Sequence, residues 1–217
     1  MQFAEIREAY RECRMCQLHV RRSRIVWAEG GVAPIMFIGE APGVEEDGCG
    51  RPFVGTSGKL LRRQLRDLDF KAGDFSISNV VRCRPPNNRT PKPEEAASCR
   101  PILDAEIHAG GAVLLVSLGN TALRSLLGPE VPGVSLLRGE TYRLGRQVLF
   151  PTFHPSACLR RRETLELWRD DLAEVKRRLG HWRSGQMELA LEVTNDLYGL
   201  ETCADPLSLG SGVGSEE

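Results

Sequence analysis

The chain has 217 residues, of which 41% are apolar and 27% are charged, enough for one domain with a buried core. No apolar run approaches the ~18 residues that a membrane span needs, so we expect no membrane partner. The first ten residues lack the basic and then apolar layout of a signal peptide, which predicts a cytoplasmic protein. Seven cysteines, an odd number, argue against a disulfide framework and favour metal ligands or free thiols.

The formal net charge of zero hides an uneven distribution. All 29 Lys and Arg lie at or before Arg183, whereas seven of the 29 Asp and Glu follow it. Residues 1–183 therefore hold 29 basic and 22 acidic residues, a net charge of +7. Most of the basic residues are Arg, the better bidentate ligand for phosphate. This body suggests a polyanionic partner, although a solvated charged face explains it equally well.

Strand and helix patterns alternate along the first half of the chain. A short apolar run predicts a strand at residues 35–38, ended by Gly39. Leucines at helical spacing between residues 60 and 68 predict a helix whose N-cap lies within residues 56–58. A run that alternates and then turns apolar predicts a second strand at 75–81, and Pro93 opens a helix that reaches about residue 108.

The same alternation continues in the second half. The pattern predicts a strand at residues 112–116 and a short helix at residues 119–127. It then predicts two further strands, at 141–144 and 148–153, and a long amphipathic helix at 163–179. Strands separated by crossover helices predict a three-layer α/β/α fold with a central, mainly parallel sheet of about four strands. Ligands of such sheets bind beyond the carboxyl ends of the strands. The candidate site therefore lies in the loops after residues 38, 81 and 153.

Two parts of the chain differ in character. We expect residues 1–183 to form one domain and residues 184–217 to form an acidic tail. The tail becomes rich in Gly and Ser from about residue 199, which predicts disorder from that point.

Four cysteines have the spacing of metal ligands. Cys13 and Cys16 form a C-x2-C pair, and Cys83 and Cys99 follow after 66 and then 15 intervening residues. Four thiolates complete a tetrahedral site for zinc or bind an iron–sulfur cluster. The spacing alone leaves open that these are four incidental thiols.

The three loops carry the other candidate residues. The first reads GEAPGVEED from residue 39 and GRPFVG from residue 50, the second reads NVVRCRPPNNRTP from residue 79, and the third reads HPSACLRRR from residue 154. Glycines after a strand let backbone amides approach a ligand, and nearby carboxylates handle protons or water. Phe53 offers a face on which a base can stack. Alone, the first loop equally suits a phosphate-binding loop or a plain turn.

Taken together, these segments resemble the family 4 uracil-DNA glycosylases, also called type a, over about residues 10–180. The resemblance implies an enzyme that flips uracil out of single- or double-stranded DNA and hydrolyses its N-glycosidic bond, which starts base excision repair. It also implies a [4Fe-4S] cluster on Cys13, Cys16, Cys83 and Cys99, with zinc as the alternative metal. We expect a monomer.

The resemblance also implies roles for individual residues. Asn79 donates to uracil O4 and accepts from N3–H, a pattern that cytosine reverses. Phe53 stacks on the base, Glu46 crowds uracil C5, and His154 donates to O2 as negative charge develops there. Ala41, where a related family carries an Asp, contributes only backbone to the uracil site.

The group that activates the water stays open among Glu40, Glu46 and Asn88. Arg160, Arg161 and Arg162 are expected to meet DNA phosphates. Relatives place an apolar wedge four positions after the histidine. Because that position is Cys158 here, Leu159 is the substitute that we expect.

Two other functions fit parts of the pattern. One is an iron–sulfur protein that binds DNA without glycosylase activity, against which the intact Glu40, Phe53, Asn79 and His154 argue. The other is a uracil-trapping relative that crosslinks to DNA, against which the absence of a KRRIH-like insertion after Asn79 argues.

Overall fold

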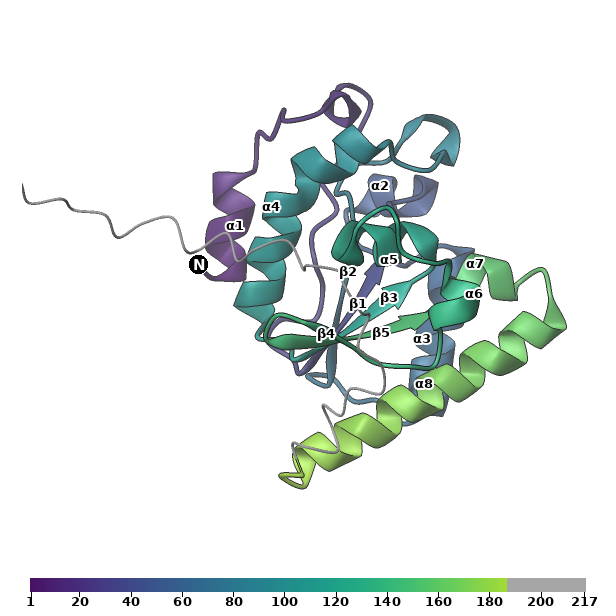
Figure 1. Cartoon of the computed structure of the whole chain (residues 1–217). Helices are drawn as coiled ribbons and strands as arrows, with labels where there is room; N and C mark the ends of the chain where they lie inside the picture. The colour runs from purple at the N-terminus through teal and green to yellow at the C-terminus, as the bar shows by residue number, and fades with distance from the viewer. Residues whose placement is uncertain (187–217) are drawn as a thin grey trace, which may run out of the picture.

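A computed structural model describes residues 1–186, which form a three-layer α/β/α fold (Figure 1). Five strands form one sheet in the order β2-β1-β3-β5-β4. They are β1 (Ile35–Gly39), β2 (Phe75–Asn79), β3 (Leu114–Leu118), β4 (Tyr142–Leu144) and β5 (Gln147–Thr152). The first three and β5 are parallel, and the short β4 pairs antiparallel with β5 at one edge. The predicted fold class is confirmed, with five strands instead of about four.

Helices cover both faces of this sheet. They are α1 (Phe3–Ala9), α2 (Val44–Cys49), α3 (Thr56–Asp67), α4 (Pro93–Gly110), α5 (Asn120–Leu127), α6 (Val134–Leu137), α7 (Pro155–Cys158) and α8 (Arg162–Arg183), with 3-10 turns η1 (Gln17–Val20) and η2 (Pro86–Asn88). None of the helices within residues 1–186 is both long and apolar enough to cross a membrane.

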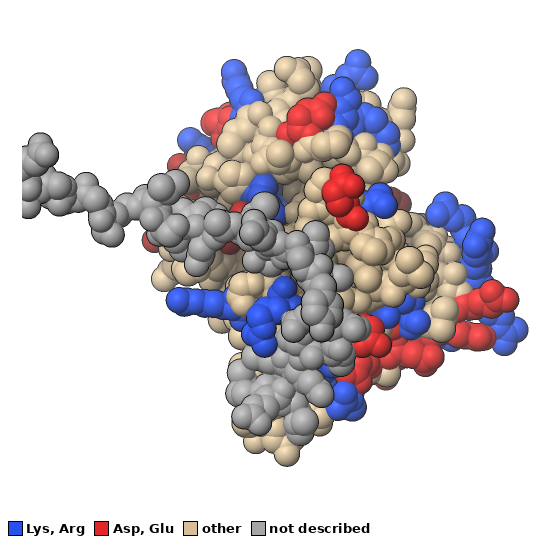
Figure 2. Space-filling model, in the orientation of Figure 1, with Lys and Arg blue, Asp and Glu red and all other residues tan. Residues whose placement is uncertain are grey.

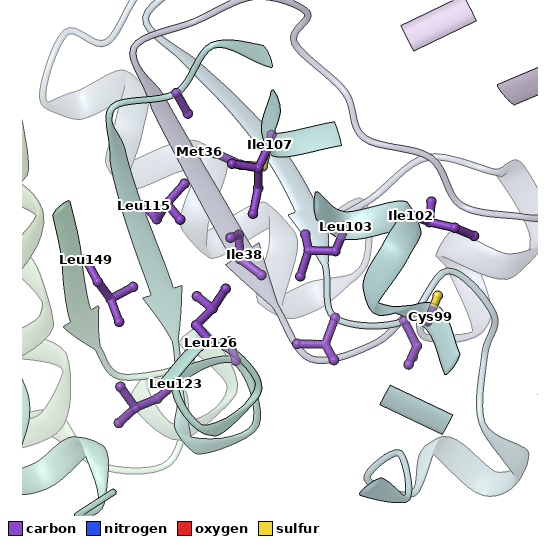
Figure 3. Close-up of a cluster of buried hydrophobic side chains, with 14 of the residues drawn as sticks. Met36, Ile38, Cys99, Ile102, Leu103, Ile107, Leu115, Leu123, Leu126 and Leu149 are labelled. Atoms are coloured by element: carbon purple, nitrogen blue, oxygen red, sulfur yellow. The ribbon is translucent and has the colours of Figure 1, made fainter. Parts of the chain in front are cut away.

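Side chains that alternate along each strand divide the interior into two cores. Met36, Leu115 and Leu149 face one way and pack with α1, α4, α5 and α6 (Figure 3). Their neighbours Phe37 and Phe150 face the other way and pack with α3, α7 and α8. The central strands β1 and β3 are therefore covered on both faces, which is why residues 35–38 and 112–116 read as continuous apolar runs.

The predicted ends of several elements were wrong by a few residues. No side chain within residues 56–58 caps α3, because the helix begins at Thr56 and its N-cap is Gly55. Strand β2 ends at Asn79 and not at residue 81. The chain turns there, and the buried Arg82 side chain donates back to the Asn79 carbonyl. Helix α8 continues to Arg183, where Arg183 pairs with the buried Asp74.

The expected acidic tail lies outside the described residues, except for residues 184–186. The candidate site lies inside them. Gly39 and Asn79 are partners in the register of β1 and β2, so these two strands end side by side. Strand β5 runs parallel to them and ends at Thr152, two residues before His154. The loops singled out in the sequence therefore leave the same edge of the sheet.

Candidate active site

A cleft of about 380 Å³ opens at the carboxyl ends of β1, β2 and β5, within the range of small-molecule sites. Seven residues that the sequence singled out line it. They are Glu40, Ala41, Glu46, Phe53, Asn79, Asn88 and His154. Leu159 and the three arginines that follow it do not line the cleft; they lie in the turn between α7 and α8 and, for Arg162, at the first position of α8.

The floor of the cleft depends on a glycine at the end of β1. A Cβ on Gly39 would lie 2.4 Å from the Phe53 ring and 2.6 Å from Asn79 Oδ1. Real Cβ atoms do not approach other atoms so closely, so only glycine fits. This residue lets the Phe53 ring and the Asn79 amide both lie close against the end of the strand.

Phe53 sits in a strained backbone conformation. Its φ is +55°, in the left-handed region that bulky residues avoid. The Phe53 backbone packs so tightly on α3 that a Cβ on Gly58 would lie 2.0 Å from the Phe53 carbonyl carbon. The ring is buried and its centroid lies 5.9 Å from that of His154, at an interplanar angle of 39°. Strain of this kind, about 1–3 kcal/mol, collects at ligand sites.

Asn79 presents an unused amide to the cleft. The residue is 3% exposed, yet its side chain makes no hydrogen bond with any residue among 1–186. Its main-chain carbonyl accepts from Arg82, whose guanidinium is paired with Glu106 at 2.6 Å in the interior. The amide is open to the cleft, since the buried side-chain polar atoms without a partner among residues 1–186 are those of Ser117 and Trp168. A fixed backbone with an unpaired amide is the arrangement expected of a group that reads a ligand.

His154 is held in one tautomer. It is the N-cap of α7, and its Nδ1 accepts the backbone N–H of Ser156 at 3.2 Å and lies 2.8 Å from Ser156 Oγ. Nδ1 is therefore the acceptor, and in the neutral ring Nε2 carries the proton. Burial, the largest cause, and the charge of Arg160 together lower the pKa of His154 to about 4 against the opposing charge of Glu46. At neutral pH the ring is an uncharged N–H donor.

Glu46 is committed to backbone donors. One carboxylate oxygen accepts N–H groups from Val54 at 2.9 Å and Gly55 at 2.8 Å, and the other accepts from Gly43 at 3.0 Å. These bonds tie α2 to the segment that carries Phe53. The geometry gives Glu46 an anchoring role, and it leaves the carboxylate little capacity to accept a proton from water.

Glu40 and Asn88 differ in the hydrogen bonds that their side chains already make. One Glu40 oxygen accepts from Thr121 Oγ1 at 2.5 Å, and the other has no partner among the described residues. The exposed Asn88 accepts from Arg84 Nε at 2.7 Å. Sequence reasoning missed Thr121 and Ser156. Thr121 follows β3, whose carboxyl end belongs to the same edge, so the rule that selected the other loops applies there too.

The turn between α7 and α8 is exposed and basic. Cys158 is 3% exposed whereas Leu159 is 50% exposed, so Leu159 and not Cys158 presents an apolar group to solvent. Arg160, Arg161 and Arg162 are all exposed. Figure 2 shows Lys and Arg side chains gathered around this turn.

The four cysteines with the spacing of metal ligands lie together beside the N-terminal half of α4, which carries Cys99. Cys13, Cys16, Cys83 and Cys99 line one small cavity. Arg22 Nη1 lies 3.4 Å from Cys83 Sγ, yet burial outweighs this contact and raises the pKa of Cys83 to about 11. Among residues 1–186, no three Cys, His, Asp or Glu side chains converge closely enough to hold a single metal ion.

Comparisons with known proteins show the family of the chain. Residues 30–176 match the family model of the uracil DNA glycosylase superfamily. The chain is 42% identical over 174 residues to the type-4 uracil-DNA glycosylase of Thermotoga maritima, with 79% of this chain and 90% of the relative covered. The type-4 enzyme of Pyrobaculum aerophilum is 39% identical, with 80% of this chain and 92% of the relative covered. The type-4 enzyme of Sulfurisphaera tokodaii is 36% identical, with 79% of this chain and 82% of the relative covered. The chain belongs to the type-4 uracil-DNA glycosylases, within the uracil DNA glycosylase superfamily.

Proposed function

We propose that this protein removes uracil from DNA by hydrolysing the bond between uracil N1 and deoxyribose C1′, the first step of base excision repair. Family membership supports the reaction. The observation that carries it is one cleft that brings together a stacking ring, an unpaired amide and a neutral imidazole donor. A base inside a duplex cannot reach this cleft, so the nucleotide is flipped out at a cost of a few kcal/mol.

Asn79 selects uracil. Its amide N–H donates to uracil O4 while its oxygen accepts from N3–H, and cytosine presents the opposite pair of groups. The Phe53 ring stacks on the base. Glu46, immobilised by three N–H donors, forms the wall next to uracil C5, where thymine carries a methyl group. Selection is sharp because a mismatched base would leave a buried amide unpaired.

His154 stabilises the leaving group. As the N1–C1′ bond breaks, its electron pair moves to the uracil ring and positive charge develops on the sugar, as in glycoside hydrolysis. The Nε2–H of His154 donates to uracil O2, where the negative charge collects. A neutral donor fits because it gives a hydrogen bond without giving up its proton.

Glu40 activates the water. The water oxygen forms the new bond to C1′, and one of the water protons passes to the carboxylate. Of the three candidates, Glu40 alone keeps a carboxylate oxygen without a partner among the described residues. Asn88 accepts from Arg84, and each Glu46 oxygen already accepts at least one backbone N–H group.

The turn between α7 and α8 holds the DNA. Arg160, Arg161 and Arg162 meet phosphates, and Leu159 fills the gap left by the flipped nucleotide. Its exposure, against the burial of Cys158, supports this assignment.

We also propose that Cys13, Cys16, Cys83 and Cys99 hold a [4Fe-4S] cluster. Such a cluster, when bound, has a structural role: it joins the segment after α1 to the start of the loop that follows Asn79. All four thiols line one cavity, and an arginine donor faces one sulfur. A single zinc would need sulfurs within about 4 Å of one another. No three possible ligands in the described part of the chain converge in that way.

Purification without oxygen tests the cluster. The protein should be brown and contain iron and sulfide, and Cys13→Ser should lose both together with thermal stability. Cys49→Ser is the matched control, because Cys49 is exposed and does not line the cavity. Colourless protein with stoichiometric zinc would overturn the proposal.

Release of free uracil tests the activity. Single- and double-stranded oligonucleotides with one uracil should yield uracil, and the same strands with thymine or cytosine should yield no base. Asn79→Asp should slow release on the order of a hundredfold, whereas Asn87→Asp, on the exposed face of η2, should not. DNA binding without release would support a binding protein, and an adduct that survives denaturation would support a trapping relative.

A further inference from the structure

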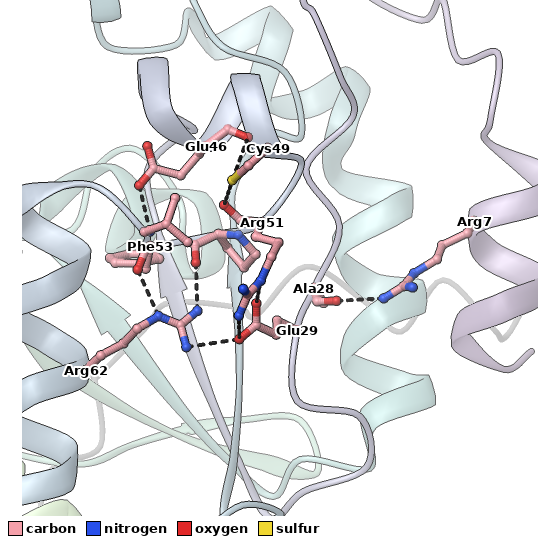
Figure 4. A network of polar contacts seen from close by, with 10 residues as sticks. Arg7, Ala28, Glu29, Glu46, Cys49, Arg51, Phe53 and Arg62 are labelled. Carbon is pink, nitrogen blue, oxygen red and sulfur yellow. Dashed lines mark hydrogen bonds and ion pairs between the residues drawn. The ribbon is translucent and has the colours of Figure 1, made fainter.

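The strained Phe53 backbone is held by a forked contact that the mechanism above does not use. Arg62, on α3, donates from Nε to the Phe53 carbonyl at 2.9 Å and from Nη2 to the Pro52 carbonyl at 2.8 Å (Figure 4). One planar guanidinium thus fixes two successive carbonyls. Because these carbonyls flank the φ of +55°, the contact sets the direction in which the Phe53 ring leaves the backbone.

The same guanidinium reaches a carboxylate on another segment. Arg62 Nη1 lies 2.9 Å from Glu29 Oε1, and Arg51 Nε donates to Glu29 Oε2 at 2.9 Å (Figure 4). Burial raises the pKa of Glu29, but the hydrogen bonds and charges of Arg51 and Arg62 outweigh it and hold the pKa below its usual value. The carboxylate is therefore ionised at neutral pH.

Glu29 is in turn anchored to the strand that carries the base reader. Its backbone N–H donates to Ile77 O at 3.0 Å, and its carbonyl accepts from Ile77 N–H at 2.8 Å. Ile77 lies on β2, two residues before Asn79. A continuous chain of bonds thus runs from Phe53 through Arg62 and Glu29 to β2.

We propose that Arg62 and Glu29 are positioning residues that set the spacing between the Phe53 ring and the Asn79 amide. This inference rests on the proposed function, in which those two groups contact the face and the edge of one uracil ring. The side chains of Arg62 and Glu29 are 29% and 30% exposed, and ion pairs this accessible contribute little to folding stability. What the pair contributes is the geometry of the cleft.

Three variants test the pair. Arg62→Gln removes the fork, Arg62→Lys keeps the charge but cannot hold two carbonyls in one plane, and Glu29→Gln removes the counter-charge. The control is Arg63→Gln, because Arg63 is the next residue on α3, is exposed, and among residues 1–186 forms an ion pair with Asp67 alone, at 3.7 Å. Each is assayed for single-turnover uracil release at saturating DNA, for DNA affinity, and for amide hydrogen exchange.

Arg62→Gln should lower the saturated rate on the order of tenfold and leave DNA affinity within about twofold, since phosphate contacts provide binding. Amides at residues 51–55 should exchange faster. Arg62→Lys should lose nearly as much rate, and Arg63→Gln should lose none. The double variant with Glu29→Gln should be no slower than Arg62→Gln, because both residues act through one contact.

Two results of the rate measurements would overturn the positioning role. One is that the losses of rate from the two substitutions add in the double variant. The other is that a lower melting temperature accounts for the whole loss of rate. Unchanged exchange at residues 51–55 would overturn it as well. If the wild type releases no uracil, the proposed function fails, and the exchange experiment still decides whether Arg62 holds the Phe53 segment.

Discussion

A histidine that donates a hydrogen bond to a forming anion must have its proton on the right nitrogen. In this protein two adjacent groups of Ser156 occupy Nδ1 and leave Nε2–H for the cleft. Desolvation keeps the ring neutral. Both effects arise within the first turn of α7, so the motif HPS encodes the donor and its tautomer together.

The depressed pKa of His154 predicts a specific loss of stability in acid. The pKa is about 4 in the folded chain and about 6.5 when unfolded, so the unfolded state binds the extra proton between these values. The contribution of His154 is full above pH 6.5 and is lost as the pH falls toward 4. Between pH 7.5 and 5 the wild type should lose about 1–2 kcal/mol more unfolding free energy than His154→Gln. Urea unfolding at both pH values measures this, and equal losses would contradict the burial of a neutral ring.

The residues that line the cleft were largely predictable from the sequence, and the residues that hold them in place were not. Asn79 and Phe53 sit in loops that follow strands, where sequence pattern is informative. Thr121 donates to Glu40, which is 81 positions away in the sequence, and Arg62 donates to the carbonyl of Phe53, which is nine positions away. Such partners are set by how helices pack on the sheet, which residue type and spacing do not encode.

At the scale of elements, one helix position connects packing to the site. Gly58 lies on α3, where alanine is normally about 0.5–1 kcal/mol better than glycine. Its Cα, however, rests against the Phe53 backbone, and an added Cβ would come within 2.0 Å of it. Glycine at this position lets the Phe53 backbone pack closely on α3, although glycine is a poorer helix former than alanine.

Two glycine-to-alanine variants should therefore change stability in opposite directions. Gly58→Ala should lower the unfolding free energy by about 1–3 kcal/mol, because the clash forces the backbone apart. Gly180→Ala, on α8, would place its Cβ in open space, so it should raise the unfolding free energy by about 0.5–1 kcal/mol. Denaturant titration compares them. A stabilised Gly58→Ala protein would show that α3 does not press on Phe53.

The central strands β1 and β3 were predicted well because both of their faces are covered, so each reads as a mainly apolar run. Element ends were predicted less well. The N-terminus of α3 has no capping side chain, since Glu46 on α2 binds the amides just before it. The last turn of α8 depends on Asp74, which is more than 100 positions away in sequence. Both boundaries depend on tertiary contacts.

For the whole molecule, charge distribution bears on DNA binding. Seven acidic residues follow residue 186, and the chain before them has a net charge of +7. Removing residues 187–217 should therefore tighten binding to a uracil oligonucleotide at low salt and steepen the fall of affinity with salt. Replacing these seven acidic residues with Gln and Asn in the full-length chain should have the same two effects on DNA binding. Unchanged affinity in both variants would show that these charges do not affect the DNA.

In the mechanism that we propose, the cleft at the carboxyl ends of β1, β2 and β5 stabilises the negative charge that develops on uracil as it leaves. The most direct test is the single-turnover rate of His154→Ala at saturating uracil DNA. A lost donor to a developing anion lowers the rate on the order of 10²–10³-fold, while the arginines of the α7–α8 turn preserve DNA affinity. We predict that result. A normal saturated rate with weakened DNA binding would contradict it, because His154 would then act on the bound state and not on the transition state.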